Sequence, residues 1–177
     1  MGRAADDTAV GMSLWLMPES GVGDRLRVLI EGLARRHRTP SFPPHLTLLG
    51  GIPGPEEDAL SRVAGLARGL GPIAIRLVDV ETSDEYFRCV FVRAEPTEAL
   101  RAAHVGARAA FANVASTPFR PHLSLLYGRL EPPERAAVLQ ELGGTLELAF
   151  EASRLHVFRT QGPPRDWRPR GAFPLGG

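Results

Sequence analysis

Two ten-residue segments of the chain nearly repeat each other, and each holds a histidine two positions before a hydroxyl residue. Residues 42–51 (FPPHLTLLGG) align with residues 119–128 (FRPHLSLLYG), with seven identical positions. The repeat pairs His45 with His122, and Thr47 with Ser124. Imidazole takes up and releases protons near neutral pH, and hydroxyl groups can donate hydrogen bonds to the charged oxygens of a phosphate. This set of side chains is suited to acid–base chemistry on a phosphate ester.

The spacing within each segment predicts a strand that presents its histidine and its hydroxyl on one face. Side chains on a strand alternate between faces and rise about 3.3 Å per residue, so residues two apart lie about 6.6 Å apart on one face. The intervening leucines then point into the core. If the two strands lie side by side, two imidazoles and two hydroxyls surround a space for one phosphate. One imidazole can then deprotonate water while the other protonates the departing ribose oxygen of a cyclic phosphate, each for a rate gain of about 10² to 10⁴.

The repeat also has less specific interpretations. A histidine on a strand is commonly a packed side chain, and duplication alone can produce a match between two segments. Duplication need not keep the polar positions, however, so their presence in both copies favours a site. A zinc site needs three or four ligands, and neither segment contains a carboxylate or a thiol, so we expect neither a metal nor a cofactor. The histidines outside the repeat are expected to be surface or hydrogen-bonded residues: His37, His104 and His156.

The composition limits the partners and the compartment. The 21 basic residues, all arginine, nearly balance 20 acidic ones, which gives no support to a polyanion such as duplex DNA. The absence of lysine excludes Schiff-base chemistry. The single cysteine, Cys89, cannot form an internal disulfide, which suits a reducing compartment. No apolar run is long enough for a signal peptide or a membrane span. We therefore expect a cytoplasmic monomer that binds neither DNA nor a membrane.

Strand and helix patterns alternate along the chain, which predicts a sheet domain of the α/β or α+β class. Alternating or continuous apolar residues predict strands over 12–17, 45–49, 73–80, 86–93, 122–127, 146–150 and 154–160. Apolar residues at helical spacing predict helices over 20–36, 55–70, 96–111 and 131–142. The tail over 162–169 is predicted to be a loop that Trp167 packs against the core. We expect a single two-lobed domain over 11–177, preceded by a disordered segment over 1–10.

The paired His-x-Thr-x and His-x-Ser-x motifs resemble the signature of the two-histidine phosphoesterase superfamily. The surrounding sequence is most similar to its cyclic phosphodiesterase branch, through four further matches. These are Ser13–Pro18 (SLWLMP), Tyr86–Phe91 (YFRCVF), Pro121–Tyr127 (PHLSLLY), and Arg159-Thr160 leading to Asp166-Trp167. The resemblance implies a bilobal fold, a duplicated β/α domain with a pseudo-twofold axis, in which antiparallel sheets line a central groove.

The resemblance also implies roles and substrates. Carried over by position, His122 is the base that activates water, His45 is the acid that protonates the leaving oxygen, and Thr47 and Ser124 bind the phosphate. Three aromatic residues are implied to line the substrate groove: Trp15, Phe87 and Tyr127. The implied reactions open ADP-ribose 1″,2″-cyclic phosphate to the 1″-phosphate, or nucleoside 2′,3′-cyclic phosphates to 2′-phosphates. Two alternatives remain, namely an enzyme acting on cyclic phosphates at RNA 3′ ends, as in the 2′–5′ RNA ligase-related branch, and a nucleotide-binding module without catalysis.

Overall fold

The computed structural model describes residues 8–115 and 117–176, and its named strands all join one antiparallel sheet. The strands of these residues are β1 (Met12–Leu16), β2 (Leu46–Ile52), β3 (Ile73–Thr82), β4 (Val90–Ala94), β5 (His122–Leu126), β6 (Thr145–Ala152), β7 (Arg154–Arg159) and β8 (Arg168–Pro174). The α-helices are α1 (Ser20–His37), α2 (Glu56–Arg68), α3 (Glu98–Ala110) and α4 (Pro132–Leu142). The predicted α+β class is confirmed.

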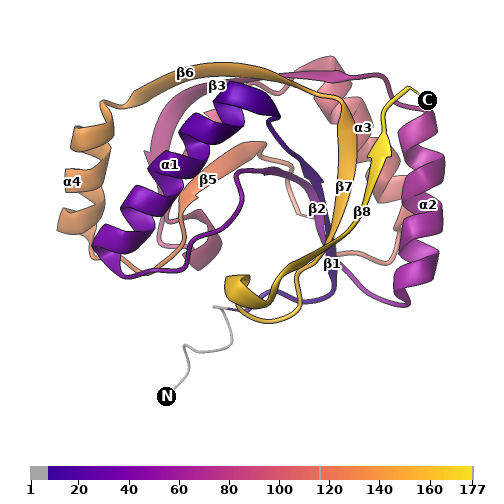
Figure 1. Cartoon of the computed structure of the whole chain (residues 1–177), viewed down its shortest axis with the longest axis horizontal. Coiled ribbons are helices and arrows are strands. Elements are labelled where there is room, and N and C mark those ends of the chain that lie inside the picture. The colour runs from indigo at the N-terminus through magenta and orange to yellow at the C-terminus, as the bar shows by residue number, and fades with distance from the viewer. Residues whose placement is uncertain (1–7, 116, 177) are drawn as a thin grey trace.

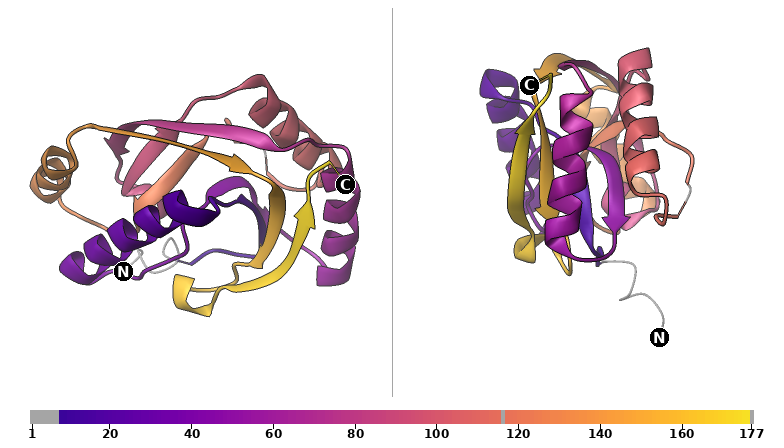
Figure 2. Two further views of the ribbon diagram at one scale, coloured as in Figure 1. Left: turned by 45° about the horizontal axis from the view of Figure 1, so that its top comes forward. Right: turned by 90° about the vertical axis from the view of Figure 1, so that its right-hand side faces the viewer.

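The sheet divides into two halves that follow the sequence repeat. The strand order is β6-β3-β4-β5-β2-β1-β7-β8, so the repeat strands β2 and β5 meet at the centre and each half has four strands. Leu46 pairs with Leu123 at this junction. These two leucines are equivalent positions of the repeat, so the pseudo-twofold axis passes between them. Figures 1 and 2 show the sheet curled into a half-barrel. The predicted two lobes are therefore halves of one continuous sheet.

Each half of the sheet receives a helix from the other half. Helix α1 follows β1 in sequence but contacts β5 and β6, and α3 follows β4 but contacts β2 of the other half as well as β3 (Figure 1). Helix α2 covers β7 and β8, and α4 covers β3 and β4. Because helices cross between the halves, neither half has a complete core on its own, which favours the predicted single domain. No helix in the described part of the chain is long and apolar enough to cross a membrane.

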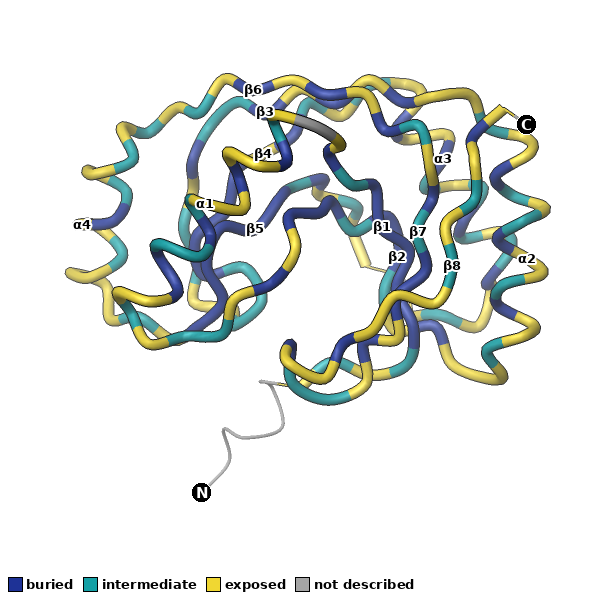
Figure 3. The backbone as a smooth tube through the Cα atoms, viewed as in Figure 1, coloured by how far each residue is buried: buried dark blue, intermediate teal, exposed yellow. Residues whose placement is uncertain are grey.

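Alternation of apolar residues accounts for the strands. In β3, Ile73, Ile75 and Leu77 are buried, while Ala74 and Arg76 between them are exposed. In the repeat strands, the leucines on either side of each hydroxyl are fully buried, as predicted: Leu46, Leu48, Leu123 and Leu125. Figure 3 shows that buried residues concentrate on the strands and on the helix faces that meet them. The core therefore lies between the sheet and its helices, and it fixes which face of β2 and β5 carries the polar residues.

The prediction of a continuous strand over 86–93 is wrong in its first half. Tyr86–Arg88 forms a short 3₁₀ helix, η2, and β4 begins only at Val90. The cause is a local turn, because the Ser83 hydroxyl donates a hydrogen bond of 2.7 Å to the Arg88 carbonyl oxygen. A side-chain hydrogen bond of this kind competes with strand pairing. It moves Phe87 out of the alternating pattern on which the prediction relied.

The prediction of a loop over 162–169 misses the last strand. After a short 3₁₀ helix, η3 (Pro164–Asp166), the chain enters β8 at Arg168 and pairs with β7. Most side chains of this edge strand are exposed, so the sequence has no apolar alternation to reveal it. The expected packing of Trp167 is present, because its indole is buried and its Nε1 donates to the Gly162 carbonyl oxygen at 2.9 Å.

The predicted disordered segment over 1–10 is only partly covered by the structure. Residues 1–7 lie outside the described residues. Ala9, by contrast, forms a β-bridge with Gly162, and the two residues exchange backbone hydrogen bonds of 3.3 and 2.9 Å. The prediction of disorder is therefore wrong for Ala9, which is part of this bridge.

Candidate active site

The junction of β2 and β5 brings the four polar residues of the repeat to one face of the sheet. The pairing of Leu46 with Leu123 is antiparallel. Continuing this register by one residue in each direction places His45 opposite Ser124 and Thr47 opposite His122. Side chains directly opposite in an antiparallel pair share a face and lie about 5 Å apart. We call these four residues the quartet: His45, Thr47, His122 and Ser124. The two histidines occupy diagonal corners of it.

Both histidines are held by the same backbone contact. Nδ1 of His45 lies 2.6 Å from the Pro43 carbonyl oxygen, and Nδ1 of His122 lies 2.7 Å from the Arg120 carbonyl oxygen. A carbonyl oxygen only accepts, so Nδ1 carries the hydrogen and Nε2 is left as the basic nitrogen. A proline separates each carbonyl from its histidine and restricts the residue before it to extended conformations. The X-Pro-His sequence therefore positions the ring.

His45 lies in an aromatic environment that excludes most solvent. It is 5% exposed, and its ring stacks on Trp15 with centroids 3.6 Å apart and planes 13° apart. Burial lowers its pKa to about 4, with a further lowering by the nearby His122 and an opposing effect of the Pro43 carbonyl. Nε2 lies 3.4 Å from the Tyr127 hydroxyl, which acts as the donor because that nitrogen has no hydrogen of its own. His45 is therefore neutral at neutral pH.

His122 is more open. It is partly exposed and lines the cavities described below. Its aromatic neighbour Phe91 meets it edge-on, with centroids 5.3 Å apart and planes 70° apart. The pKa of His122 is lowered by desolvation and by the charge of Arg88, while its bond to the Arg120 carbonyl and the charge of Glu85 act in the opposite direction. A neutral imidazole with access to solvent is suited to accept a proton from water.

The two hydroxyl residues are in different states. Ser124 is buried, and its hydroxyl donates a hydrogen bond of 2.8 Å to the Phe87 carbonyl oxygen. Thr47 is partly exposed and lines the same cavity as His122. Thr47 can therefore donate to a bound anion directly, whereas Ser124 must first turn its O–H away from Phe87.

The aromatic residues predicted to line the groove lie mostly beneath the quartet in this structure. Trp15 and Tyr127 are only 1% and 3% exposed, and Trp15 is sandwiched between His45 and Phe158, whose centroid is 3.9 Å away. Phe87 is partly buried and packs edge-on against Tyr127 at 5.2 Å. Their contact with a substrate therefore stays a prediction, and Trp15 and Tyr127 are both buried in this structure. Trp15 is covered by Phe158 and Trp167 of the C-terminal segment, and Tyr127 stacks on Phe42 with centroids 3.6 Å apart.

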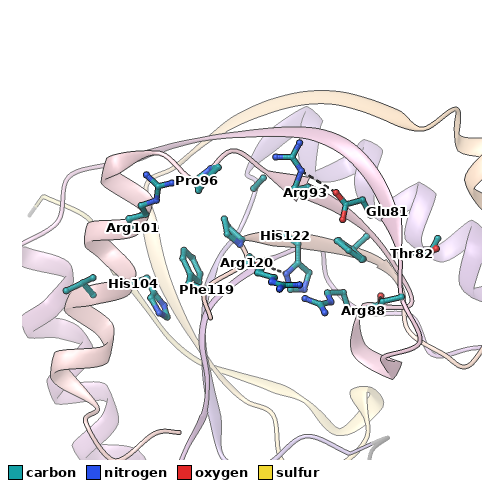
Figure 4. A pocket seen from close by; sticks show the side chains of 15 residues that line it. Glu81, Thr82, Arg88, Arg93, Pro96, Arg101, His104, Phe119, Arg120 and His122 are labelled. Carbon is teal, nitrogen blue, oxygen red and sulfur yellow. Dashed lines mark hydrogen bonds and ion pairs between the residues drawn. The ribbon is translucent and has the colours of Figure 1, made fainter. Parts of the chain in front are cut away.

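Two adjoining cavities open beside the quartet, with volumes of about 710 and 530 Å³. Five residues line both: Arg88, His104, Phe119, Arg120 and His122. Figure 4 shows the larger cavity, with His122 and Arg120 at its base, His104 and Phe119 at one side and Arg88 at the other. Thr47 belongs to the wall of the smaller cavity. The face of β2 and β5 that carries the quartet is thus directly connected to space for a ligand.

Of the five residues that line both cavities, only His122 is predicted as a site residue; Arg88, His104, Phe119 and Arg120 are not. His104 is expected to be a hydrogen-bonded histidine; its Nδ1 does bond to the Leu48 carbonyl oxygen at 2.8 Å, but its ring also borders both cavities. Phe119 enters the prediction only as part of the repeat, and it stacks on His104 with centroids 4.0 Å apart. Arg88 lies in η2, whose fold is predicted incorrectly. The repeat could have indicated Phe119, since it aligns with Phe42.

No three histidine, cysteine or acidic side chains within residues 8–115 and 117–176 are grouped so that they could hold a metal ion.

Comparison with known proteins connects this geometry to a family. Residues 22–164 match the model of the 2′-5′ RNA ligase superfamily. The chain belongs to that superfamily. Its members include the two-histidine phosphoesterases that the paired motifs resemble, so that resemblance is confirmed. Among curated proteins, this superfamily member is 29% identical over 153 residues to the cyclic phosphodiesterase of Arabidopsis thaliana, with 84% of each chain covered.

Solved structures of similar fold cover almost the whole of this superfamily member. The protein TT0787 of Thermus thermophilus has a TM-score of 0.72 at 22% identity, covering 95% of this chain and 99% of that one. Escherichia coli LigT complexed with 3′-AMP has a TM-score of 0.58 at 18% identity, covering 94% and 98%. At these identities the likeness shows the fold, which agrees with the half-barrel described above.

Proposed function

We propose that the chain is a cyclic phosphodiesterase that hydrolyses small nucleotide cyclic phosphates at the quartet. The substrates are ADP-ribose 1″,2″-cyclic phosphate, giving the 1″-phosphate, or nucleoside 2′,3′-cyclic phosphates, giving 2′-phosphates. The observation that carries the proposal is the pair of imidazoles, each fixed through Nδ1 to a backbone carbonyl, on the same face as two hydroxyls and beside a cavity. The name of the Arabidopsis relative supports it. So do the LigT structures, in which that protein is complexed with 3′-AMP, NADP+ or ATP.

The reaction needs one water molecule and two proton transfers. Nε2 of His122 accepts a proton from water as the water oxygen attacks phosphorus, because this ring is neutral and open to the cavity. The bond from phosphorus to one ribose oxygen then breaks, and His45 supplies the proton to that oxygen. The leaving atom is the 2″ oxygen of ADP-ribose or the 3′ oxygen of a nucleoside. Thr47 and Ser124 donate hydrogen bonds to the non-bridging oxygens, whose negative charge grows in the transition state.

The acid role of His45 requires a proton that the free protein lacks at neutral pH. Burial holds its pKa near 4, but a phosphate anion placed against Nε2 favours the charged imidazolium. Substrate binding therefore takes up a proton, and the Tyr127 hydroxyl must leave Nε2 to make room for the leaving oxygen. Because proton uptake accompanies substrate binding, His45 is charged only in the complex with substrate, where its proton is needed.

The test is a panel of ADP-ribose 1″,2″-cyclic phosphate, the four nucleoside 2′,3′-cyclic phosphates and an RNA oligomer with a cyclic 3′ end. Each is incubated with and without EDTA, and phosphorus NMR identifies which ester bond opens. We expect hydrolysis of the small cyclic phosphates at the same rate with and without EDTA. Turnover of the RNA oligomer alone would favour the RNA-end alternative, and no turnover of any substrate would favour a non-catalytic binding module.

A further inference from the structure

The larger cavity extends beyond the space that a cyclic phosphate needs. The smaller cavity, about 530 Å³ with Thr47 and His122 in its wall, already has the size of a small-ligand pocket. The larger one, about 710 Å³, shares His122 but continues from there between β4 and the first half of α3. Its extra volume lies on the side away from β2, so a substrate held at the quartet can extend into it.

One wall of this extension is an aromatic platform. The Phe119 ring lies parallel to the His104 ring, with centroids 4.0 Å apart and planes 5° apart. His104 is itself fixed by the bond from its Nδ1 to the Leu48 carbonyl oxygen. His104 covers one face of Phe119, yet the Phe119 side chain is only partly buried and borders the cavity. The remaining ring face is therefore available for stacking, which is worth about 1–3 kcal/mol for a nucleobase on an aromatic side chain.

Two arginines beside the platform carry positive charge that no described residue neutralises. Arg101 and Arg120 both line the cavity and are both exposed. Neither side chain forms an ion pair or hydrogen bond with another described residue, in contrast to Arg93 on the opposite side, which pairs with Asp79 and Glu81. Figure 4 shows Arg101 on α3 and Arg120 next to His122, with Phe119 in the same wall. A guanidinium group is suited to bind a phosphate through two parallel hydrogen bonds.

We propose that this extension is a second subsite, formed by Arg101, Phe119 and Arg120, for the nucleoside diphosphate part of a substrate whose cyclic phosphate lies at the quartet. The base stacks on Phe119, and the phosphates that are not hydrolysed lie against the two arginines. The proposal rests on the proposed function and selects, within it, a substrate with additional phosphates. A long RNA is disfavoured, because it needs a continuous basic track, whereas the wall of this cavity also contains Glu81, which neutralises Arg93 beside it (Figure 4).

The test compares two substrates that share a 1,2-cyclic phosphate and differ in the second group, together with an RNA substrate that carries a 2′,3′-cyclic phosphate. Specificity constants (kcat/KM) are measured for ADP-ribose 1″,2″-cyclic phosphate, ribose 1,2-cyclic phosphate and an RNA trinucleotide with a cyclic 3′ end. In the wild type we expect at least about a tenfold preference for the ADP-ribose compound over the ribose compound, expressed mainly in KM. Arg101→Ala should reduce this ratio about tenfold, the loss expected for a charged hydrogen bond. Arg25→Ala, which removes an exposed arginine on α1 outside the cavities, should not change it.

The outcomes separate the subsite from the catalytic proposal. Equal kcat/KM for the ADP-ribose and ribose compounds, unchanged by Arg101→Ala, would overturn the subsite while leaving the hydrolase intact. A preference for the RNA trinucleotide that Arg101→Ala abolishes would overturn the diphosphate assignment in favour of RNA. If no cyclic phosphate is hydrolysed, calorimetric titration with ADP still tests the subsite. ADP binding that is weakened about tenfold by Arg101→Ala and by Phe119→Ala, but not by Arg25→Ala, would support it. Equal binding by all variants, or no binding by the wild type, would refute it.

Discussion

The two copies of the repeat have the same local geometry and opposite surroundings. His45 and His122 each bond through Nδ1 to the carbonyl oxygen two residues earlier, at 2.6 and 2.7 Å. His45 is nevertheless buried against flat aromatic rings, while His122 faces a cavity. The difference shows that the repeated sequence sets the orientation of each imidazole but not its exposure to solvent.

The exposure is set by the aromatic residue that the neighbouring strand provides. Trp15 of β1 lies opposite Thr47, and Phe91 of β4 lies opposite Ser124. These are equivalent places in the two halves. The indole covers its histidine face to face, at 3.6 Å and 13°, whereas the phenyl ring touches its histidine with an edge, at 5.3 Å and 70°. Two nearly symmetric copies can thus hold two histidines with different roles.

The largest effect that we expect comes from removing either imidazole. His45→Ala and His122→Ala should each lower kcat at least about a hundredfold, because each deletes one of the two proton transfers. His37→Ala, on α1 and outside the cavities, is the matched control and should keep wild-type activity. Circular dichroism checks that the variants are folded. A variant of His45 or His122 with near-normal turnover would contradict the acid–base scheme.

A substrate with sulfur in place of the leaving oxygen distinguishes the effects of the two variants. A thiolate departs without protonation far more readily than an alkoxide, since thiols have a pKa near about 8.5. With this substrate, we expect the turnover of His45→Ala, as a fraction of wild-type turnover, to be at least about tenfold higher than with the oxygen substrate. The same fraction for His122→Ala should not change. Recovery by His122→Ala instead would exchange the roles of acid and base.

The pH dependence of stability tests the contrast in the folded state without substrate. The unfolded chain binds a proton at His45 below its ordinary pKa of 6.5, but the folded chain does so only near pH 4. Between pH 6.5 and pH 4, proton binding at His45 therefore favours the unfolded state. The contribution of His45 is fully present above pH 6.5 and falls by up to about 3 kcal/mol as the pH drops to 4.

The measurement is the free energy of unfolding in urea at a series of pH values. His45→Gln should remove most of this acid destabilisation relative to the wild type, and His122→Gln should remove less because His122 is the more open ring. Equal slopes for the wild type and His45→Gln between pH 4 and 6.5 would show that His45 is not buried as a neutral group.

The repeat makes the quartet predictable, because period-two alternation of buried leucines fixes which face of a strand His45 and Thr47 occupy. The sequence cannot show how far each ring is covered. It places Trp15 on the correct face, but the burial of that residue depends on Phe158 and on the buried Trp167, which the C-terminal segment brings back over β1. Arg88 is missed for a related reason, since a single hydrogen bond from a serine converts the expected strand into η2. The burial of Trp15 and the fold around Arg88 therefore both depend on contacts that the apolar pattern of the strands does not reveal.

The smallest expected effect comes from exchanging the aromatic neighbours of the two histidines, Trp15 and Phe91. This exchange tests the difference between the two copies most directly. Trp15→Phe gives the first copy the residue of the second, so water should reach His45 and its pKa should rise from about 4 towards the ordinary value. Loss of indole packing should cost about 1–3 kcal/mol of stability. Phe91→Trp should act in the reverse direction on His122 and lower its pKa. NMR titration of the histidine Cε1 protons measures both. An unchanged pKa of His45 in a folded Trp15→Phe variant would mean that the rest of the aromatic cluster, and not the indole, excludes water from that ring.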